Sequence, residues 1–135
     1  ENPYVAYCTG LCYLNSINEK SKAFSLLKIA SLNVSKEHDY ESVSGQNAPV
    51  ETWLFLGDAY RLNNEFREAI RCYQRYASIS EKPKAGETAM KRIRECNVAR
   101  LLQSKPLNIK WELLDKSVNQ GIANFNPVIS SDGTI

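Results

Sequence analysis

The 135-residue chain contains a single histidine and no glycine-rich loop of the kind that cradles a phosphate. With one histidine, no histidine pair can hold a metal ion, and no serine or cysteine has a base at the spacing of a nucleophile motif. These absences argue against the common enzyme classes. We therefore expect a protein that is not an enzyme, with no catalytic residue, no cofactor and no metal.

The chain also lacks a strong excess of charge and long apolar runs. A net charge of +2 gives no basic face for nucleic acid or for an anionic membrane. No apolar run is long enough to span a bilayer. The chain begins ENPYVAY, without an initiator Met or the basic and apolar regions of a signal peptide. We therefore expect a processed chain or an excised fragment.

The four cysteines do not have the spacing of a zinc site, because Cys8 and Cys12 have no matching pair downstream. We expect all four, including Cys72 and Cys96, to be small apolar residues in helix packing. A disulfide between distant segments is the alternative if the compartment is oxidising. His38 lies in a polar stretch and is expected to be a solvated loop residue.

The stretch WLFLGDAYRLNNEFREAIRCYQRYA, residues 53–77, contains the pattern W-x2-L-G-x2-Y followed by A-x3-Y. This is the tetratricopeptide signature of two antiparallel helices, with Tyr in place of the usual Phe. Gly57 and Ala69 are small, as expected where two helix backbones approach closely, and Asn64 is expected to cap the second helix. The predicted core residues are Trp53, Leu56, Gly57, Tyr60, Ala69 and Tyr73.

A weaker copy of the pattern precedes this one, in AYCTGLCYLNSINEKSKAFSLLKIA. Gly10, Ala23 and Leu27 occupy matching positions, with one extra residue between the two helices. We expect these helices at about residues 3–14 and 18–33.

The two copies are further apart than one repeat length. Gly10 and Gly57 are separated by 47 residues, whereas this repeat type has a period of about 34. The surplus is expected to form either an inserted polar loop or an extension of the second helix followed by a loop. A third amphipathic stretch follows the second pair and suits a capping helix, because a stack of helix pairs must cover its last apolar face.

The predicted fold is therefore all-α. Its expected organisation is a tetratricopeptide domain over residues 1–105, with repeat one at about 3–34, an inserted loop at 35–48, repeat two at about 49–81 and a capping helix at about 85–103, followed by residues 106–135.

Stacked helix pairs form a concave surface lined by the first helix of each pair. Such a groove suits an extended peptide or a partner helix, with apolar anchors for affinity and charges for register. The alternative, that an upstream segment covers the residues of the first pair, stays open. The predicted partner-binding residues are Tyr4, Tyr7, Leu11, Leu14, Glu51, Leu54, Asp58 and Arg61.

After the capping helix, apolar and polar residues alternate with the period of a β-strand. The chain then ends in VNQGIANFNPVISSDGTI. Its Pro127, Ser130, Asp132 and Gly133 resemble the P-x-x-S-x-D-G segment that precedes a strand in TolB-like β-propellers. We interpret residues 106–135 as a linker and the truncated start of a β-propeller.

Helical repeats followed by this tail resemble the OmpA-family envelope proteins of Bacteroidetes. The segments APVETWLFLGDAYRLNNEFREAI and RIRECNVARLLQSKP also resemble the repeat region of that group. Its members combine tetratricopeptide repeats, a β-propeller and a peptidoglycan-binding domain. The resemblance implies a periplasmic, outer-membrane-associated protein, and some members link the type IX secretion and gliding machinery to peptidoglycan. The peptidoglycan-binding domain and the lipidated Cys of that group are absent from this chain.

The expected function is non-catalytic contact between proteins, within a larger envelope protein. A free-standing cytosolic adaptor and a structural spacer with no groove ligand are the alternatives. A lone strand has unpaired backbone groups that need a partner. A further hypothesis therefore places the tail, residues 120–135, in the groove of a neighbouring chain.

Overall fold

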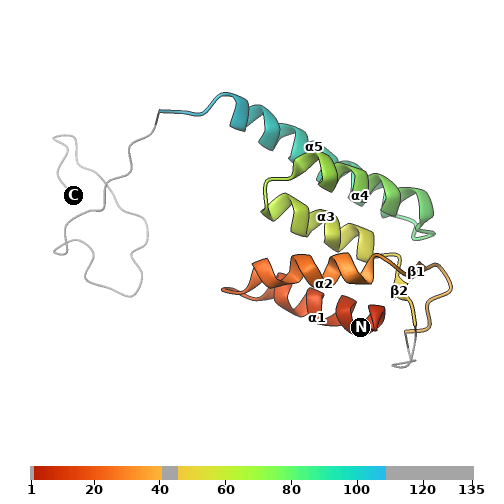
Figure 1. Cartoon of the computed structure of the whole chain (residues 1–135). Helices are drawn as coiled ribbons and strands as arrows, with labels where there is room; N and C mark the ends of the chain where they lie inside the picture. Colours follow the sequence, from red (N-terminus) through yellow and green to blue (C-terminus); the bar gives the residue numbers. More distant parts are fainter. Residues whose placement is uncertain (1, 41–45, 109–135) are drawn as a thin grey trace, which may run out of the picture. The chain divides into compact units, whose positions relative to one another are not determined.

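The computed structural model describes residues 2–40 and 46–108, and over these residues the fold is all-α (Figure 1). The helices belong to one compact unit, Glu1–Lys105, and Pro106–Ile135 is a second unit. Residues 106–108 of the second unit are described and are not helical. The predicted propeller entry and the predicted docking of residues 120–135 lie outside the described residues.

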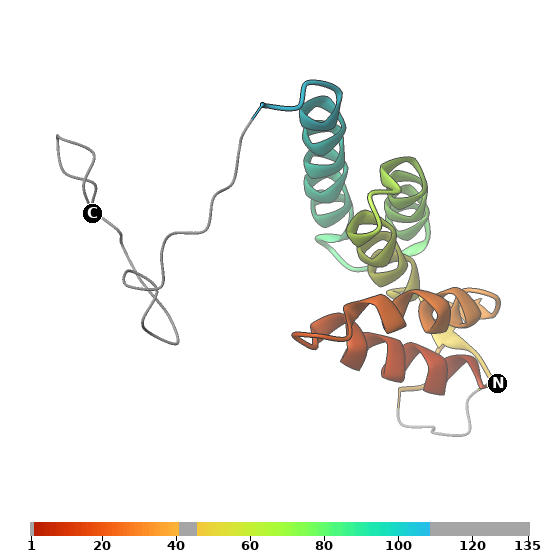
Figure 2. The same ribbon diagram turned by 60° about the vertical axis from the view of Figure 1, so that its left-hand side comes forward.

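The described part of the first unit is built from two helix pairs and a fifth helix. Figure 2 looks more nearly along α3, α4 and α5, whereas α1 and α2 run across the view, so the two pairs are turned relative to each other. The elements are α1 (Pro3–Asn15), the 3-10 helix η1 (Lys20–Lys22), α2 (Ala23–Ala30), β1 (Val34–Ser35), β2 (Ala48–Pro49), α3 (Thr52–Leu62), α4 (Phe66–Ile79) and α5 (Ala85–Ser104).

The first pair begins at a capped helix terminus. The Asn2 side chain accepts hydrogen bonds from the backbone N–H groups of Tyr4 and Val5, at 2.9 and 3.3 Å, and Pro3 needs no such partner. The second helix of this pair is shorter than the predicted 18–33. It begins at Ala23, after η1, and ends at Ala30, and beyond its end the Asn33 side chain donates to the carbonyl of Gln46 at 2.6 Å, next to β1 and β2.

The second pair follows the predicted signature. The turn between α3 and α4 passes through Asn64, whose φ of 62° is left-handed, a conformation that Asn tolerates better than most residues. Asn64 therefore makes the turn, and Glu65 stands at the N-cap of α4 without a side-chain capping bond, contrary to our expectation. Among the predicted core residues, Leu56, Gly57, Ala69 and Tyr73 are buried, and Trp53 and Tyr60 are half-buried.

In each helix pair, a glycine on the first helix lies against a large side chain on the second helix. A Cβ atom on Gly57 would lie 2.5 Å from Cε1 of Tyr73, and one on Gly10 would lie 2.9 Å from Cγ of Leu27. Real Cβ atoms do not approach other atoms so closely, so both positions require glycine. In both pairs, therefore, a glycine of the first helix lies against a side chain of the second.

Helix α5 packs against α4 and extends one residue beyond the predicted range. Its small residues Ala85, Ala89 and Cys96 are buried in a cluster with Tyr73 of α4. Other apolar side chains of this helix are more than half exposed: Met90, Val98, Leu101 and Leu102.

The described residues of the connection between the pairs are mostly exposed, but the connection also makes ordered contacts with the rest of the unit. Its ends form a short parallel pairing, with Val34 opposite Ala48. His38 is only 8% exposed; its ring lies 4.5 Å from that of Tyr4 and 4.7 Å from that of Tyr40, measured between centroids. Its Nδ1 lies 2.9 Å from Oδ1 of Asn47. The expectation of a solvated histidine was wrong because two aromatic rings cover it.

The cysteines divide into two kinds. Cys72 and Cys96 are buried as expected, and burial raises the pKa of the Cys72 thiol to about 12. Cys8 and Cys12 are exposed on α1, so for these two the prediction of packing residues was wrong. All four are free thiols, and no disulfide joins them.

Substituting Gly57 with leucine tests the close approach in the second pair. Tyr73 is fully buried and cannot move aside, so we expect Gly57→Leu to lower the free energy of unfolding by about 1–3 kcal/mol or more, by overpacking. Gly86→Leu is the matched control, because nothing lies within 4 Å of a Cβ at that position. Urea unfolding measures both. Equal stabilities of Gly57→Leu and the wild type would contradict this packing.

Candidate functional site

The eight residues predicted to bind a partner lie on α1 and α3, except Glu51, which directly precedes α3. Tyr7, Glu51 and Asp58 are buried, each with 9% or less of its surface exposed. These three therefore do not form a free surface. The half-buried members are Tyr4, Leu11, Leu14, Leu54 and Arg61.

A pocket of about 260 Å³ lies between the end of α1, η1, α3 and α5, and we call it the inner groove. Three of the predicted residues line it, and sequence reasoning missed the other five. Its lining residues are Leu14, Asn15, Lys20, Phe55, Asp58, Arg61, Leu62 and Arg92.

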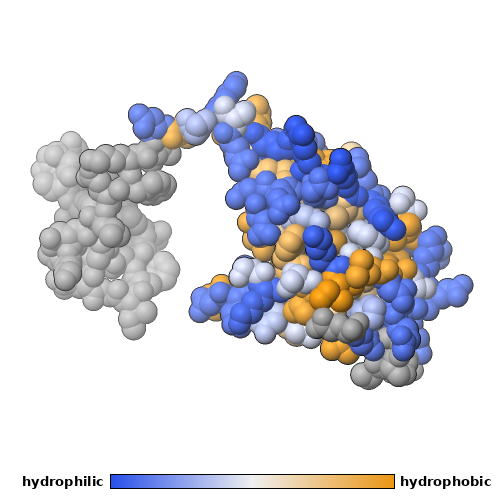
Figure 3. Space-filling view, viewed as in Figure 1, coloured by the Kyte–Doolittle hydropathy of each residue, from blue (hydrophilic) through white to orange (hydrophobic). Residues whose placement is uncertain are grey.

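Of the predicted residues outside the inner groove, Tyr4 packs against the buried histidine and Leu54 against the α4/α5 cluster. Tyr7 lies 6.1 Å from Phe55, measured between ring centroids, and Leu11 packs against the same core. In the view of Figure 3, apolar residues gather where the first helix pair meets the second, with hydrophilic residues around them.

Asp58 joins α3, α4 and α5 beside the inner groove. Its Oδ1 accepts a hydrogen bond from the Tyr73 hydroxyl at 2.8 Å. Arg61 Nη2 and Arg92 Nε lie 3.5 and 3.4 Å from the same oxygen. Glu95 lies 3.6 Å from Arg61 and 3.3 Å from Arg92. Two carboxylates therefore hold two guanidinium groups in place, while both arginine side chains remain 34% exposed and accessible to a ligand.

The protonation of Tyr73 keeps this arrangement intact. Burial raises the pKa of the Tyr73 hydroxyl far above its usual value, and the adjacent Asp58 carboxylate raises it further. The hydroxyl therefore stays protonated and donates to the carboxylate. A buried carboxylate costs free energy unless it is paired and hydrogen-bonded, and Asp58 meets this requirement with three partners.

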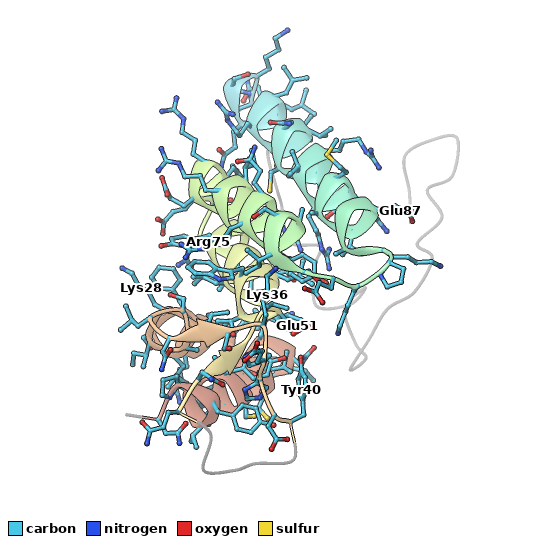
Figure 4. All side chains as sticks on the ribbon, turned by 90° about the vertical axis from the view of Figure 1, so that its right-hand side faces the viewer. Lys28, Lys36, Tyr40, Glu51, Arg75 and Glu87 are labelled. Carbon is cyan, nitrogen blue, oxygen red and sulfur yellow. The ribbon has the colours of Figure 1, made fainter. Side chains whose placement is uncertain are left out.

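A second buried carboxylate, Glu51, lies two helical turns before Asp58 and so on the same side of α3. Its Oε2 accepts a hydrogen bond from the Tyr40 hydroxyl at 2.8 Å, and Lys82 Nζ lies 2.5 Å from its Oε1. Glu51 thereby joins the α2–α3 connection to the α4–α5 connection. Figure 4 shows Tyr40 and Glu51 on the side where these connections lie.

Opposing effects set the pKa of Glu51. Burial alone raises it, but hydrogen bonds from Lys82, from the backbone and from Tyr40 outweigh burial, and the pKa lies below its usual value. The pKa of Tyr40 is raised to about 12, mainly by burial and to a smaller extent by the hydrogen bond to Glu51. The tyrosine therefore remains a donor, and the glutamate remains charged at neutral pH.

Two of the missed groove residues could have been found by helical periodicity. Phe55 and Leu62 are seven residues apart and share one side of α3. Arg92, in contrast, is on a different helix from Asp58, and no local pattern connects the two positions.

In the described part of the chain, no group of three or more His, Cys, Asp or Glu side chains is arranged to hold a metal ion. No described helix is long and apolar enough to cross a membrane. Comparisons with protein-family models, with curated proteins and with solved structures each found no match to this chain.

Replacing Glu51 by glutamine tests the buried ion pair through pH. A carboxylate whose folded-state pKa is lowered stabilises the fold above its unfolded pKa, about 4.3. That stabilisation is lost as the pH falls through the lower folded-state pKa. We expect Glu51→Gln to be less stable than the wild type by roughly 1–2 kcal/mol at pH 7. The difference should narrow as the pH falls below about 5.

Urea unfolding across this pH range measures the effect. Glu81→Gln is the control, because the Glu81 side chain is 85% exposed and its ion pair with Lys36, at 3.6 Å, lies on the surface. Its pH profile should match that of the wild type. A Glu51→Gln profile with the wild-type slope would show that the Glu51–Lys82 pair does not stabilise the fold.

Proposed function

We propose that the unit Glu1–Lys105 is a tetratricopeptide-type module that docks an extended segment of a partner protein, without catalysing a reaction. The repeat assignment rests on the shared packing of Gly10 with Leu27 and of Gly57 with Tyr73. Both contacts join the first helix of a pair to the second at matching positions. Such modules use the first helices of their pairs for recognition, and the inner groove is lined mainly by residues of α1, α3 and α5.

The observation that carries this proposal is the combination of apolar and fixed cationic groups in the inner groove. Leu62 remains 49% exposed beside the half-buried Phe55. Arg61 and Arg92 are held by carboxylates while remaining partly exposed. An apolar side chain of the partner would pack on Leu62 and Phe55. Its neighbouring oxygen atoms would accept hydrogen bonds from the guanidinium groups, which are preorganised and therefore lose less freedom on binding.

A structural spacer is the competing function for the same fold. In a spacer the leucine and the arginines of the inner groove would contact only water, and the buried carboxylates would serve stability alone. Covalent capture in the groove separates these two functions.

A photo-crosslinking amino acid at Leu62 tests docking directly. In the native host, we expect it to give adducts with a small, reproducible set of proteins. The same group at Arg94, which is exposed on α5 and outside the inner groove, is the matched control. Mass spectrometry identifies the adducts. The same sparse background from both positions would contradict docking and favour the spacer.

We further propose that the module works in the periplasm, as part of an outer-membrane-associated protein that links a secretion complex to peptidoglycan. The support is the resemblance of the repeats and of the tail to OmpA-family envelope proteins. Contact with peptidoglycan would be made by a domain outside this chain. The competing proposal is a free-standing cytosolic adaptor.

Protease accessibility in the native host tests the location. After permeabilisation of the outer membrane alone, we expect added protease to degrade the protein while a cytosolic marker stays intact. Protection until the inner membrane is lysed would contradict the periplasmic proposal and favour the cytosolic adaptor.

A further inference from the structure

The side of the unit formed by α2 and α4 carries a second concave surface, which shares no residue with the inner groove. Two adjoining pockets, of about 300 and 280 Å³, have Ser31, Leu32, Trp53 and Arg75 in common. We call the combined surface the outer groove. The side chains that matter for its chemistry are Lys28, Leu32, Lys36, Trp53, Arg71 and Arg75.

An arginine over an indole ring forms the centre of the outer groove. The guanidinium carbon of Arg75 lies 3.9 Å from the centre of the Trp53 ring, a cation–π contact. This contact does not use the N–H groups of the guanidinium for an ion pair, and these N–H groups form a fork that matches a carboxylate. The ring holds the guanidinium group in place, so binding a carboxylate costs less side-chain freedom.

An exposed leucine lies at the rim of this groove. Leu32 is 83% exposed, although both pockets include it. It stands in the turn after α2, beside the half-buried Trp53. A ligand side chain that covered Leu32 and the edge of the indole would remove apolar surface from water.

The cations of the outer groove are only partly neutralised. Arg71 Nη1 lies 2.9 Å from both carboxylate oxygens of Glu68, so the charge of Arg71 is already neutralised within the protein. Lys36 lies 3.6 Å from the exposed Glu81. Among the described residues, Lys28 and Arg75 have aromatic contacts but no ion pair with a carboxylate within 4.0 Å. Figure 4 shows Lys28, Lys36 and Arg75 on the same side of the unit.

We propose that the outer groove is a second docking site, which binds an acidic segment of a partner protein in which carboxylates flank an apolar side chain. The carboxylates complement Arg75 and Lys28, and the apolar side chain packs on Leu32 and Trp53. A polyphosphate chain would complement the charges alone and leave Leu32 exposed, so the observations favour a peptide. This site is independent of the inner groove and of the function proposed for it.

The test uses the whole chain, immobilised, and two matched peptide pools. The acidic pool contains heptapeptides with Asp or Glu at five positions and Leu, Ile or Phe at two. In the control pool, Asn and Gln replace the acids. At low salt, we expect at least tenfold more acidic than amide peptide to be retained. This excess should be lost in Arg75→Ala and reduced in Lys28→Gln, since charge complementarity carries the interaction.

Three controls make the result decisive. Arg94→Ala removes an exposed cation outside the outer groove and should retain the acidic pool like the wild type. Leu62→Glu alters only the inner groove and should also retain it, so failure of one site is distinguishable from failure of the other. Thermal unfolding confirms that each variant is folded, and Lys28→Gln is a surface change that should not affect folding.

Four outcomes would overturn the proposal. The first is equal retention of the two pools, and the second is retention of the acidic pool that does not depend on Arg75 and Lys28. The third is complete displacement of the acidic pool by a short DNA duplex that itself binds through Arg75, which would show that the groove recognises polyanions in general. Failure to retain the acidic pool at low salt also counts against the proposal.

Discussion

The contact between Tyr73 and Gly57 is the constraint on which the second helix pair depends. The phenol ring occupies the space that a side chain at position 57 would need, so α3 and α4 approach at the distance that glycine allows. The hydroxyl of the same residue donates to Asp58, and Asp58 in turn holds Arg61 and Arg92. One side chain therefore sets both the spacing of two helices and the position of the charges in the inner groove.

The parts of the fold that could be predicted were those with a local cause. The pair over residues 53–77 could be found because its apolar and small residues recur at helical spacing. The burial of His38, Glu51 and Asp58 could not be found, because ionisable side chains are usually exposed. Each of the three also has a partner on another segment: Tyr4 for His38, Lys82 for Glu51 and Tyr73 for Asp58. Three of the eight residues that line the inner groove were predicted, for the same reason. Periodicity identifies the side of α3 that lines the groove, but not Arg92 of α5.

Helix α3 supplies residues to both proposed grooves. Trp53 faces the outer groove, and Phe55 and Asp58 face the inner groove. A helix can present side chains on opposite sides only if its other sides are packed, and here the first pair, α4 and α5 provide that packing. The buried carboxylate of Glu51 is paired with Lys82, and that of Asp58 with Arg61 and Arg92. The negative charges on this side of α3 are therefore compensated.

The pairing of Val34 with Ala48 has a consequence for how such chains are compared. It brings the two ends of the connection together, so further residues inserted between them would lengthen the connection without displacing the helices. The free energy of closing a loop grows only slowly with its length, by about 0.6 kcal/mol for each doubling. Relatives could therefore differ widely in the number of residues here and keep the same helix packing. A search for a constant interval between glycines would miss them, whereas an alignment that restarts at Ala48 would recover them.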